Sequence, residues 1–317
     1  MKTSNTLYLV IPCFNEQEVL PETSRRLLNK MQTLIMNNTI SKKSRILFVD
    51  DGSTDRTWKL ILEMHENNNL FSGLKLSRNR GHQNALLAGL LTVKDLSDVT
   101  ISLDADLQDD PDSIDQFLTS FFSGNDIVYG VRKDRSSDTT VKRGTARLFY
   151  KLMNFMKVES VFNHADCRLL SKRALSALSD FKEVNLFLRG MVPLIGFNSD
   201  IVTYNRVARF AGQSKYPFKK MLQLAANGIT SFSVAPIRFI LFIGIFIFSI
   251  SLLSILFLAV IAAIGISFNS IFWLLTSIWL ACGIITASIG IVGEYVGKAF
   301  EEVKARPRYI IEEFLNY

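Results

Sequence analysis

Short apolar runs alternate with amphipathic segments along the N-terminal part of this chain. The runs are rich in β-branched and aromatic residues, a composition that predicts strands. Strands are predicted at Leu7–Ile11, Arg45–Val49, Gly73–Leu76, Val99–Leu103, Asp126–Tyr129 and around Asp200–Tyr204. Helical spacing of apolar residues predicts helices at Glu18–Met36, Thr54–Glu66, Ile114–Phe122, Lys172–Leu178 and Val184–Leu194. Because strands and helices alternate, the pattern indicates an α/β fold built from parallel βαβ units. The mainly polar segment Asn163–Leu169 is predicted as a turn.

The C-terminal third has a different pattern. No Asp, Glu, Lys or Arg occurs from Phe239 to Gly293. A membrane span needs about 20 apolar residues, so two transmembrane helices are predicted, at about 237–264 and 270–295. Residues 215–236 predict an amphipathic helix region at the membrane surface, with an ordinary core helix as the alternative. The chain is therefore divided into a domain at 1–214, the interfacial region at 215–236, the spans at 237–297 and a tail at 298–317.

Charge and cysteine content indicate where these parts lie. Basic residues flank the predicted spans, whereas the turn between the spans is uncharged; they are Arg238, Lys298, Lys304, Arg306 and Arg308. The positive-inside rule then puts the N-terminal domain and both termini in the cytoplasm, at the inner membrane. Three scattered cysteines and no signal peptide agree with a reducing compartment. The net charge of +7 arises largely near the predicted membrane region, so no nucleic-acid partner is expected.

Acidic residues follow three of the predicted strands. Glu16 follows the first strand, Asp50 and Asp51 end the second, and Asp104 and Asp106 follow Val99–Leu103. The carboxyl ends of parallel strands meet at one edge of a sheet, where α/β proteins bind ligands. Carboxylate oxygens suit Mg²⁺ or Mn²⁺, although a solvated acidic turn is the simpler interpretation of the pair by itself. No glycine-rich dinucleotide motif or P-loop is present.

An ordered set of motifs resembles the family 2 glycosyltransferases of the GT-A fold. The similarity is to those that use polyprenyl phosphates, such as bactoprenol glucosyltransferases and dolichyl-phosphate mannose synthases. The motifs cover nearly the whole chain and are Ile11–Glu16, Asp50–Ser53, Asn79–Gln83, Asp104–Gln108, Asp166–Leu169, Gly212–Tyr216, Gly293–Gly297 and Arg306–Tyr309. The resemblance implies a GT-A domain, Rossmann-like with a mostly parallel sheet, followed by two transmembrane helices.

The resemblance also implies roles for individual residues. Nucleotide-sugar contacts are expected from Pro12, Phe14, Glu16, Val49, Asp50, Asp51, Asp104, Ala105 and Asp106. The metal, Mg²⁺ or Mn²⁺, would be held by Asp106 and Gln108. The acceptor phosphate would be bound by Arg132, Arg143, Arg206, Arg209 and Lys215. The residues expected to carry the catalysis are Asp104, Asp106, Asp166 and Arg209.

Two residues near these motifs have open interpretations. Asp166 either orients a sugar hydroxyl or the acceptor, or caps the N-terminus of the following helix. His82 is expected to be a structural hydrogen-bonding residue, because no second histidine is spaced to bind a metal with it.

The sequence therefore predicts an inverting hexosyltransferase that moves a sugar, glucose first, from a nucleotide sugar such as UDP-glucose to undecaprenyl phosphate. The lipid-linked sugar would serve cell-envelope glycan modification, with a flippase and a downstream glycosyltransferase as partners. Small residues in the spans would allow a homo-oligomer. The alternatives are another donor (GDP-mannose, UDP-N-acetylglucosamine or an amino-arabinose sugar), a processive synthase and an inactive membrane scaffold. The synthase is disfavoured because its Gln-x-x-Arg-Trp element is absent.

Overall fold

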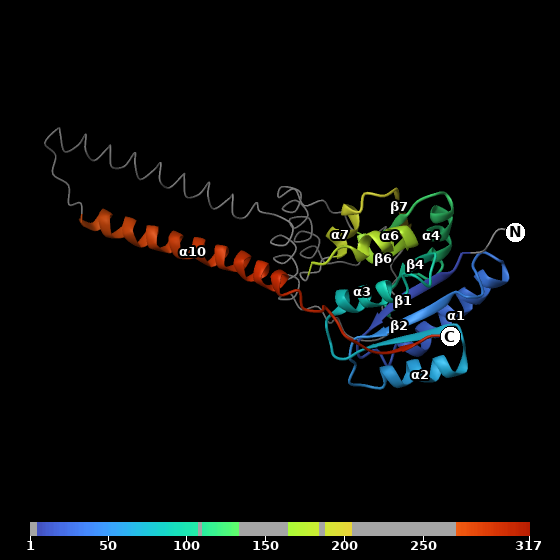
Figure 1. The fold of residues 1–317 in the computed structure, drawn as a ribbon. Helices are drawn as coiled ribbons and strands as arrows, with labels where there is room; N and C mark the ends of the chain where they lie inside the picture. The colour runs from blue at the N-terminus through green and yellow to red at the C-terminus, as the bar shows by residue number, and fades with distance from the viewer. Residues whose placement is uncertain (1–4, 107–109, 133–163, 184–187, 205–270) are drawn as a thin grey trace.

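A computed structural model describes five parts of the chain, shown in colour in Figure 1: residues 5–106, 110–132, 164–183, 188–204 and 271–317. The strands of these parts form one sheet in the order β7-β5-β6-β4-β1-β2-β3-β8. Their bounds are β1 Leu7–Cys13, β2 Arg45–Asp50, β3 Phe71–Leu76, β4 Val99–Ser102, β5 Ile127–Arg132, β6 His164–Ser171, β7 Ser199–Tyr204 and β8 Ile311–Leu315. Strands β1 to β4 pair in parallel, as do β5 and β7, whereas β6 and β8 run antiparallel to their neighbours.

Helices cover both faces of the sheet. Those of the described parts are α1 Leu20–Met36, α2 Thr57–Asn67, α3 His82–Thr92, α4 Ser113–Phe122, α6 Lys172–Ser179, α7 Leu188–Leu194 and α10 Ile271–Lys304. Helices α1, α2 and α4 pack with Leu7 and Leu9 of β1 on one face. Helices α3, α6 and α7 pack with Tyr8 and Val10 on the other. The nearly unbroken apolar run in β1 is explained by this arrangement, because both faces of the strand are buried.

The prediction of a polar turn at Asn163–Leu169 is wrong, because most of this segment belongs to β6. Its polar side chains are typical of an exposed turn. In the structure, however, Cys167 and Leu169 are buried in the core and Arg168 is only 1% exposed. Arg168 is held there by an ion pair with Asp166. Nor is Asp166 a helix cap: α6 is capped by Ser171, whose hydroxyl oxygen accepts a hydrogen bond from the Ala174 N–H.

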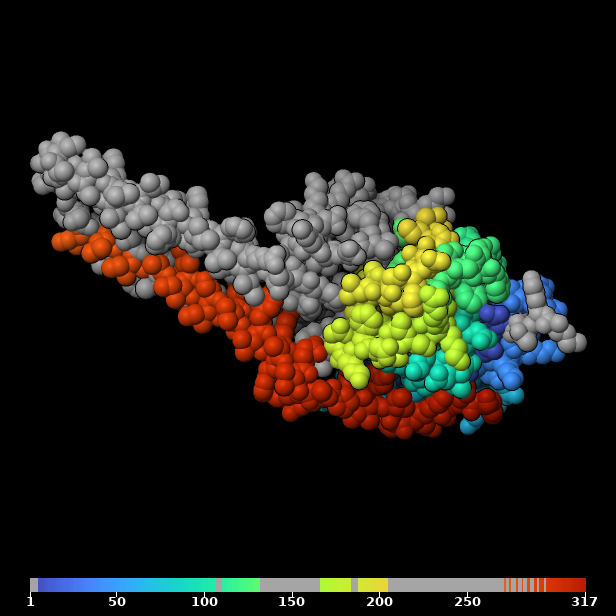
Figure 2. All heavy atoms as spheres, turned by 45° about the horizontal axis from the view of Figure 1, so that its top comes forward, coloured from blue at the N-terminus to red at the C-terminus, as the bar shows by residue number. Residues whose placement is uncertain are grey.

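The C-terminal segment returns to the sheet. Helix α10 extends away from the domain, and the residues after it run back along the domain surface (Figure 2). Strand β8, in the segment expected as a tail, pairs with the edge of β3. Beyond it, the amide oxygen of Asn316 accepts hydrogen bonds from the hydroxyls of Ser72 and Tyr8. The segment after α10 therefore adds an edge strand to the sheet.

Among the described residues, no helix is long and apolar enough to cross a membrane. The first predicted span, 237–264, and the predicted interfacial region, 215–236, lie outside the described residues.

Candidate active site

The chemistry-bearing residues gather at the carboxyl edge of the parallel strands. The loops after β1, β2 and β4 all leave the sheet at this edge. Strand β6 runs the other way and therefore begins there, with Arg168 opposite Ser102 of β4. The Ser102 hydroxyl donates to the carbonyl oxygen of Asp166 at 2.6 Å. The antiparallel pairing thus brings Asp166 next to Asp104, although the two are far apart in sequence.

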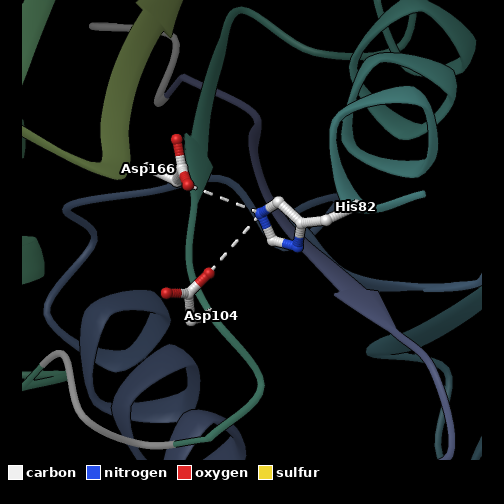
Figure 3. A group of neighbouring side chains, drawn as sticks. All are labelled: His82, Asp104 and Asp166. Atoms are coloured by element: carbon white, nitrogen blue, oxygen red, sulfur yellow. Dashed lines mark ion pairs between the residues drawn. The ribbon is translucent and has the colours of Figure 1, made fainter. Parts of the chain in front are cut away.

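His82 completes this group from the opposite side. It is the first residue of α3, preceded by Gly81 at a φ of +88°, a conformation that glycine adopts readily. Its Nε2 atom lies 3.7 Å from Oδ1 of Asp104 and 3.7 Å from Oδ2 of Asp166, as Figure 3 shows. The ligand atoms of the three side chains lie within 4.8 Å of one another, so the group could hold a metal ion.

Two arginines balance the charge of Asp166. Arg189 approaches it as a fork, with Nε 3.0 Å from Oδ1 and the terminal nitrogen 3.0 Å from Oδ2. The Arg168 guanidinium donates to Oδ1 at 3.2 Å and to the carbonyl oxygen of Leu188 at 3.2 Å. Burial by itself would raise the pKa of Asp166, but the charge and hydrogen bonds of Arg189, with His82 and Arg168, hold that pKa well below its usual range. Asp166 is therefore a carboxylate at neutral pH.

Asp50 and Asp51 organise the loops behind this group. Asp51 is 2% exposed and accepts hydrogen bonds from the backbone N–H groups of Arg80 at 2.7 Å and Gly81 at 2.9 Å. Asp50 is fully buried, and both of its oxygens lie 3.3 Å from the Ser53 nitrogen, which donates to them. Burial raises the pKa of both carboxyl groups. Asp51 therefore fixes the turn that carries His82 into the site.

The loop after β1 is tied to the loop after β2. The Asn15 N–H donates to the Ser53 hydroxyl, and the Glu16 N–H donates to the Thr57 hydroxyl, each at 2.9 Å. Phe14 and Glu16 are half-buried in this loop, and the backbone positions of Pro12 and Val49 pair side by side in β1 and β2. These residues, expected to contact a nucleotide, are thus brought together at one end of the two strands.

The acidic loop after β4 is fixed through its middle residue. Ala105 is buried, and its carbonyl oxygen accepts a hydrogen bond from the Thr23 hydroxyl at 2.7 Å. Asp104 and Asp106 on either side remain partly exposed. Arg132 is the last residue of β5, at the same edge of the sheet. The other predicted site residues, Gln108, Arg143, Arg206, Arg209 and Lys215, lie outside the described residues.

His82 is the residue whose place in the site the sequence analysis missed. Its approach to Asp166 depends on the antiparallel pairing of β6, which a turn prediction could not supply. The available signal was its position directly after a glycine at the start of a helix that follows a strand.

Comparison with known proteins identifies the family. Residues 8–179 match the model of Glycosyl transferase family 2. The uncharacterized glycosyltransferase YkoT of Bacillus subtilis (strain 168) is 50% identical over 98% of this chain and 93% of its own length. The SfII prophage-derived bactoprenol glucosyl transferase of Shigella flexneri is 36% identical over 96% of this chain and 97% of its own.

Among solved structures, the glucosyl-3-phosphoglycerate synthase of Mycobacterium tuberculosis is 14% identical and has a TM-score of 0.46, covering 71% of this chain and 76% of its own. That likeness is too low to bear on function. The family match and the full-length relatives confirm the predicted α/β GT-A domain and the predicted hexosyltransferase activity. The chain belongs to family 2 of the glycosyltransferases.

Proposed function

We propose that this protein transfers glucose from UDP-glucose to undecaprenyl phosphate and inverts the configuration at C1. The observation that carries the proposal is the full-length similarity to relatives named bactoprenol glucosyl transferase, at 36% identity. The site at the sheet edge supports it, because its carboxylates and arginines suit a charged donor. The lipid-linked sugar would then serve as a donor for glycans of the cell envelope.

The side chains of the acidic loop fit a divalent cation. Ala105 is fixed by Thr23, so the loop is held in place while the carboxylates of Asp104 and Asp106 stay accessible. Such oxygen ligands suit Mg²⁺ or Mn²⁺. We assign Asp106, together with Gln108, to hold the ion. When bound, the ion offsets the negative charge that develops on the departing nucleoside diphosphate.

The residues of this chain do not need to supply a strong base. The acceptor phosphate is already anionic, so one of its oxygens attacks C1 directly. The new bond joins that oxygen to C1, and the bond from C1 to the diphosphate oxygen breaks with its electron pair. Asp166, held ionised by Arg189 and Arg168, is a weak base and serves to orient the sugar or the acceptor. Basic residues predicted near the acceptor, including Arg132 and Arg209, would hold its phosphate in line.

Membrane attachment is part of the proposal and rests chiefly on the sequence. The uncharged stretch Phe239–Gly293 has the length of two spans. Apolar side chains such as Ile278, Ile285 and Ile289 are exposed along α10, which supports a lipid-facing role. We place the enzyme in the cytoplasmic membrane with its catalytic domain and both termini in the cytoplasm, where its lipid acceptor is within reach.

The metal assignment is tested with two matched variants of the full-length protein. Asp106→Asn removes a proposed metal ligand and is expected to lower glucose transfer to undecaprenyl phosphate by about 10²-fold or more. Asp112→Asn is the control, because the Asp112 side chain is 82% exposed and pairs with Lys30 on the surface. Equal transfer by both variants would contradict the role of Asp106.

The donor is tested in the same assay. UDP-glucose, UDP-N-acetylglucosamine, GDP-mannose and an amino-arabinose nucleotide are supplied separately. Transfer with UDP-glucose at the highest kcat/KM is expected, and preference for another donor would revise the sugar while keeping the reaction class. Absence of nucleotide binding would favour the inactive scaffold.

A further inference from the structure

The Nε2 atom of His82 lies 3.7 Å from an oxygen of Asp104 and 3.7 Å from an oxygen of Asp166, and the space between these three side chains is called the gap below. The Nε2 atom of His82 is buried and has no hydrogen-bond partner. Its distance of 3.7 Å from each carboxylate is too long for a hydrogen bond, which spans about 2.7–3.2 Å. A buried ring nitrogen without a partner is unfavourable, so it indicates a ligand atom that completes the group. Figure 3 shows this nitrogen directed between the two carboxylates.

Each of the three side chains is held in position by its own neighbours. Asp166 is fixed by the fork of Arg189. His82 is fixed through its backbone, because the preceding turn donates two N–H groups to Asp51. Asp104 follows a strand paired on both sides, β4, and precedes the pinned Ala105. A group fixed from behind in this way is preorganised for a ligand.

The charge around the gap favours a neutral polar ligand over a second metal ion. Asp166 is already paired with Arg189 and Arg168, so the described residues balance its negative charge without a second cation. The Nε2 atom lies 3.7 Å from one oxygen of each carboxylate, a spacing that lets a hydroxyl oxygen between them reach these atoms at hydrogen-bond distance.

We propose that the gap binds two neighbouring hydroxyl groups of the donor hexose. His82 donates its Nε2–H to one hydroxyl oxygen, and Asp104 and Asp166 each accept a hydrogen from one hydroxyl. His82 is thereby a specificity-determining residue that selects the hydroxyl pattern of the sugar. This inference rests on the proposed transfer of a hexose from a nucleotide sugar. A site built to bond a hydroxyl discriminates strongly against a sugar that lacks it.

The test compares UDP-glucose with its 2-, 3-, 4- and 6-deoxy analogues in the full-length enzyme. For the wild type, loss of a recognised hydroxyl is expected to lower kcat/KM by about 10- to 100-fold. In His82→Ala this penalty falls to about threefold or less for one analogue, because the partner of that hydroxyl is gone. His82→Gln, which places an amide N–H near the same position, restores part of the penalty. His65→Gln, on α2 and outside the group, leaves the penalties unchanged.

The same comparison by calorimetric binding separates this inference from the proposed acceptor. If no sugar is transferred to undecaprenyl phosphate but the binding penalties still depend on His82, the proposed acceptor is refuted. The proposed binding of donor hydroxyls in the gap is then supported. Penalties identical in wild type and His82→Ala for every analogue would overturn the inference. A raised half-saturating Mn²⁺ concentration in His82→Ala, without any change in these penalties, would also overturn it and identify His82 as a metal ligand.

Discussion

Replacing Asp51 with Asn tests whether this carboxylate builds the active-site loop. Both of its oxygens accept backbone N–H groups, from Arg80 and Gly81, in a position only 2% exposed. Each such bond to a charged group contributes about 1.5–3 kcal/mol. In Asp51→Asn one bond is lost and the other loses its charge. The cost of burying the charge, which raises the pKa of Asp51, disappears in the neutral variant and offsets part of this loss.

The net loss expected for Asp51→Asn is about 1–3 kcal/mol in the free energy of unfolding. Urea titration of the full-length protein, followed by tryptophan fluorescence, measures it. Because the turn also positions His82, kcat is expected to fall while the Kd for UDP changes little. A variant with unchanged stability and a much weaker Kd for UDP would refute this reasoning, since Asp51 would then act mainly as a nucleotide ligand.

Three further outcomes follow from the structure. Gly52→Ala is expected to cost about 2–4 kcal/mol of stability, because Gly52 has a φ of +67° and a Cβ would meet the Arg78 backbone at 2.6 Å; Gly124→Ala, with a φ of +99° and open space, should cost less in the same urea titration. Asp166→Asn should destabilise the protein at neutral pH, and the difference from wild type should shrink progressively as the pH falls below about 4, because folding lowers the pKa of Asp166 and the unfolded chain is protonated first; equal differences at pH 7 and pH 3 would contradict this. Removal of residues 311–317 exposes the edge of β3 and should lower the thermal midpoint by about 5–10 °C, and an unchanged midpoint would show that β8 adds nothing to the sheet.

The central strands could be predicted from the sequence because nearly all of their residues are apolar, as expected for strands that are buried on both faces. Leu7–Ile11 is apolar on both faces, and the structure buries both faces. The acidic loop was found for the same reason: Asp104 and Asp106 stand where the apolar run of β4 stops. Local composition was sufficient wherever a segment behaves as an ordinary buried strand.

The remaining features depend on pairings that composition does not encode. Asp166 and Arg168 made β6 resemble a turn. In the structure Arg168 is buried, and its charge is paired with that of Asp166. Strand β8 carries two glutamates and an exposed face, so its sequence resembles a tail. The closeness of His82 to Asp166 follows from the pairing of β6, which places Asp166, and the local sequence around His82 does not encode that pairing.

The most direct test of the proposed reaction is the transfer of labelled glucose from UDP-glucose to added undecaprenyl phosphate, which is then extracted into a lipid phase. The purified full-length protein is assayed with Mn²⁺ or Mg²⁺, with and without a chelator, and label is counted in the lipid phase. The account predicts lipid-phase label that appears with UDP-glucose and is abolished by the chelator. Binding of UDP-glucose without any label in the lipid phase would contradict the proposed acceptor and require a different one.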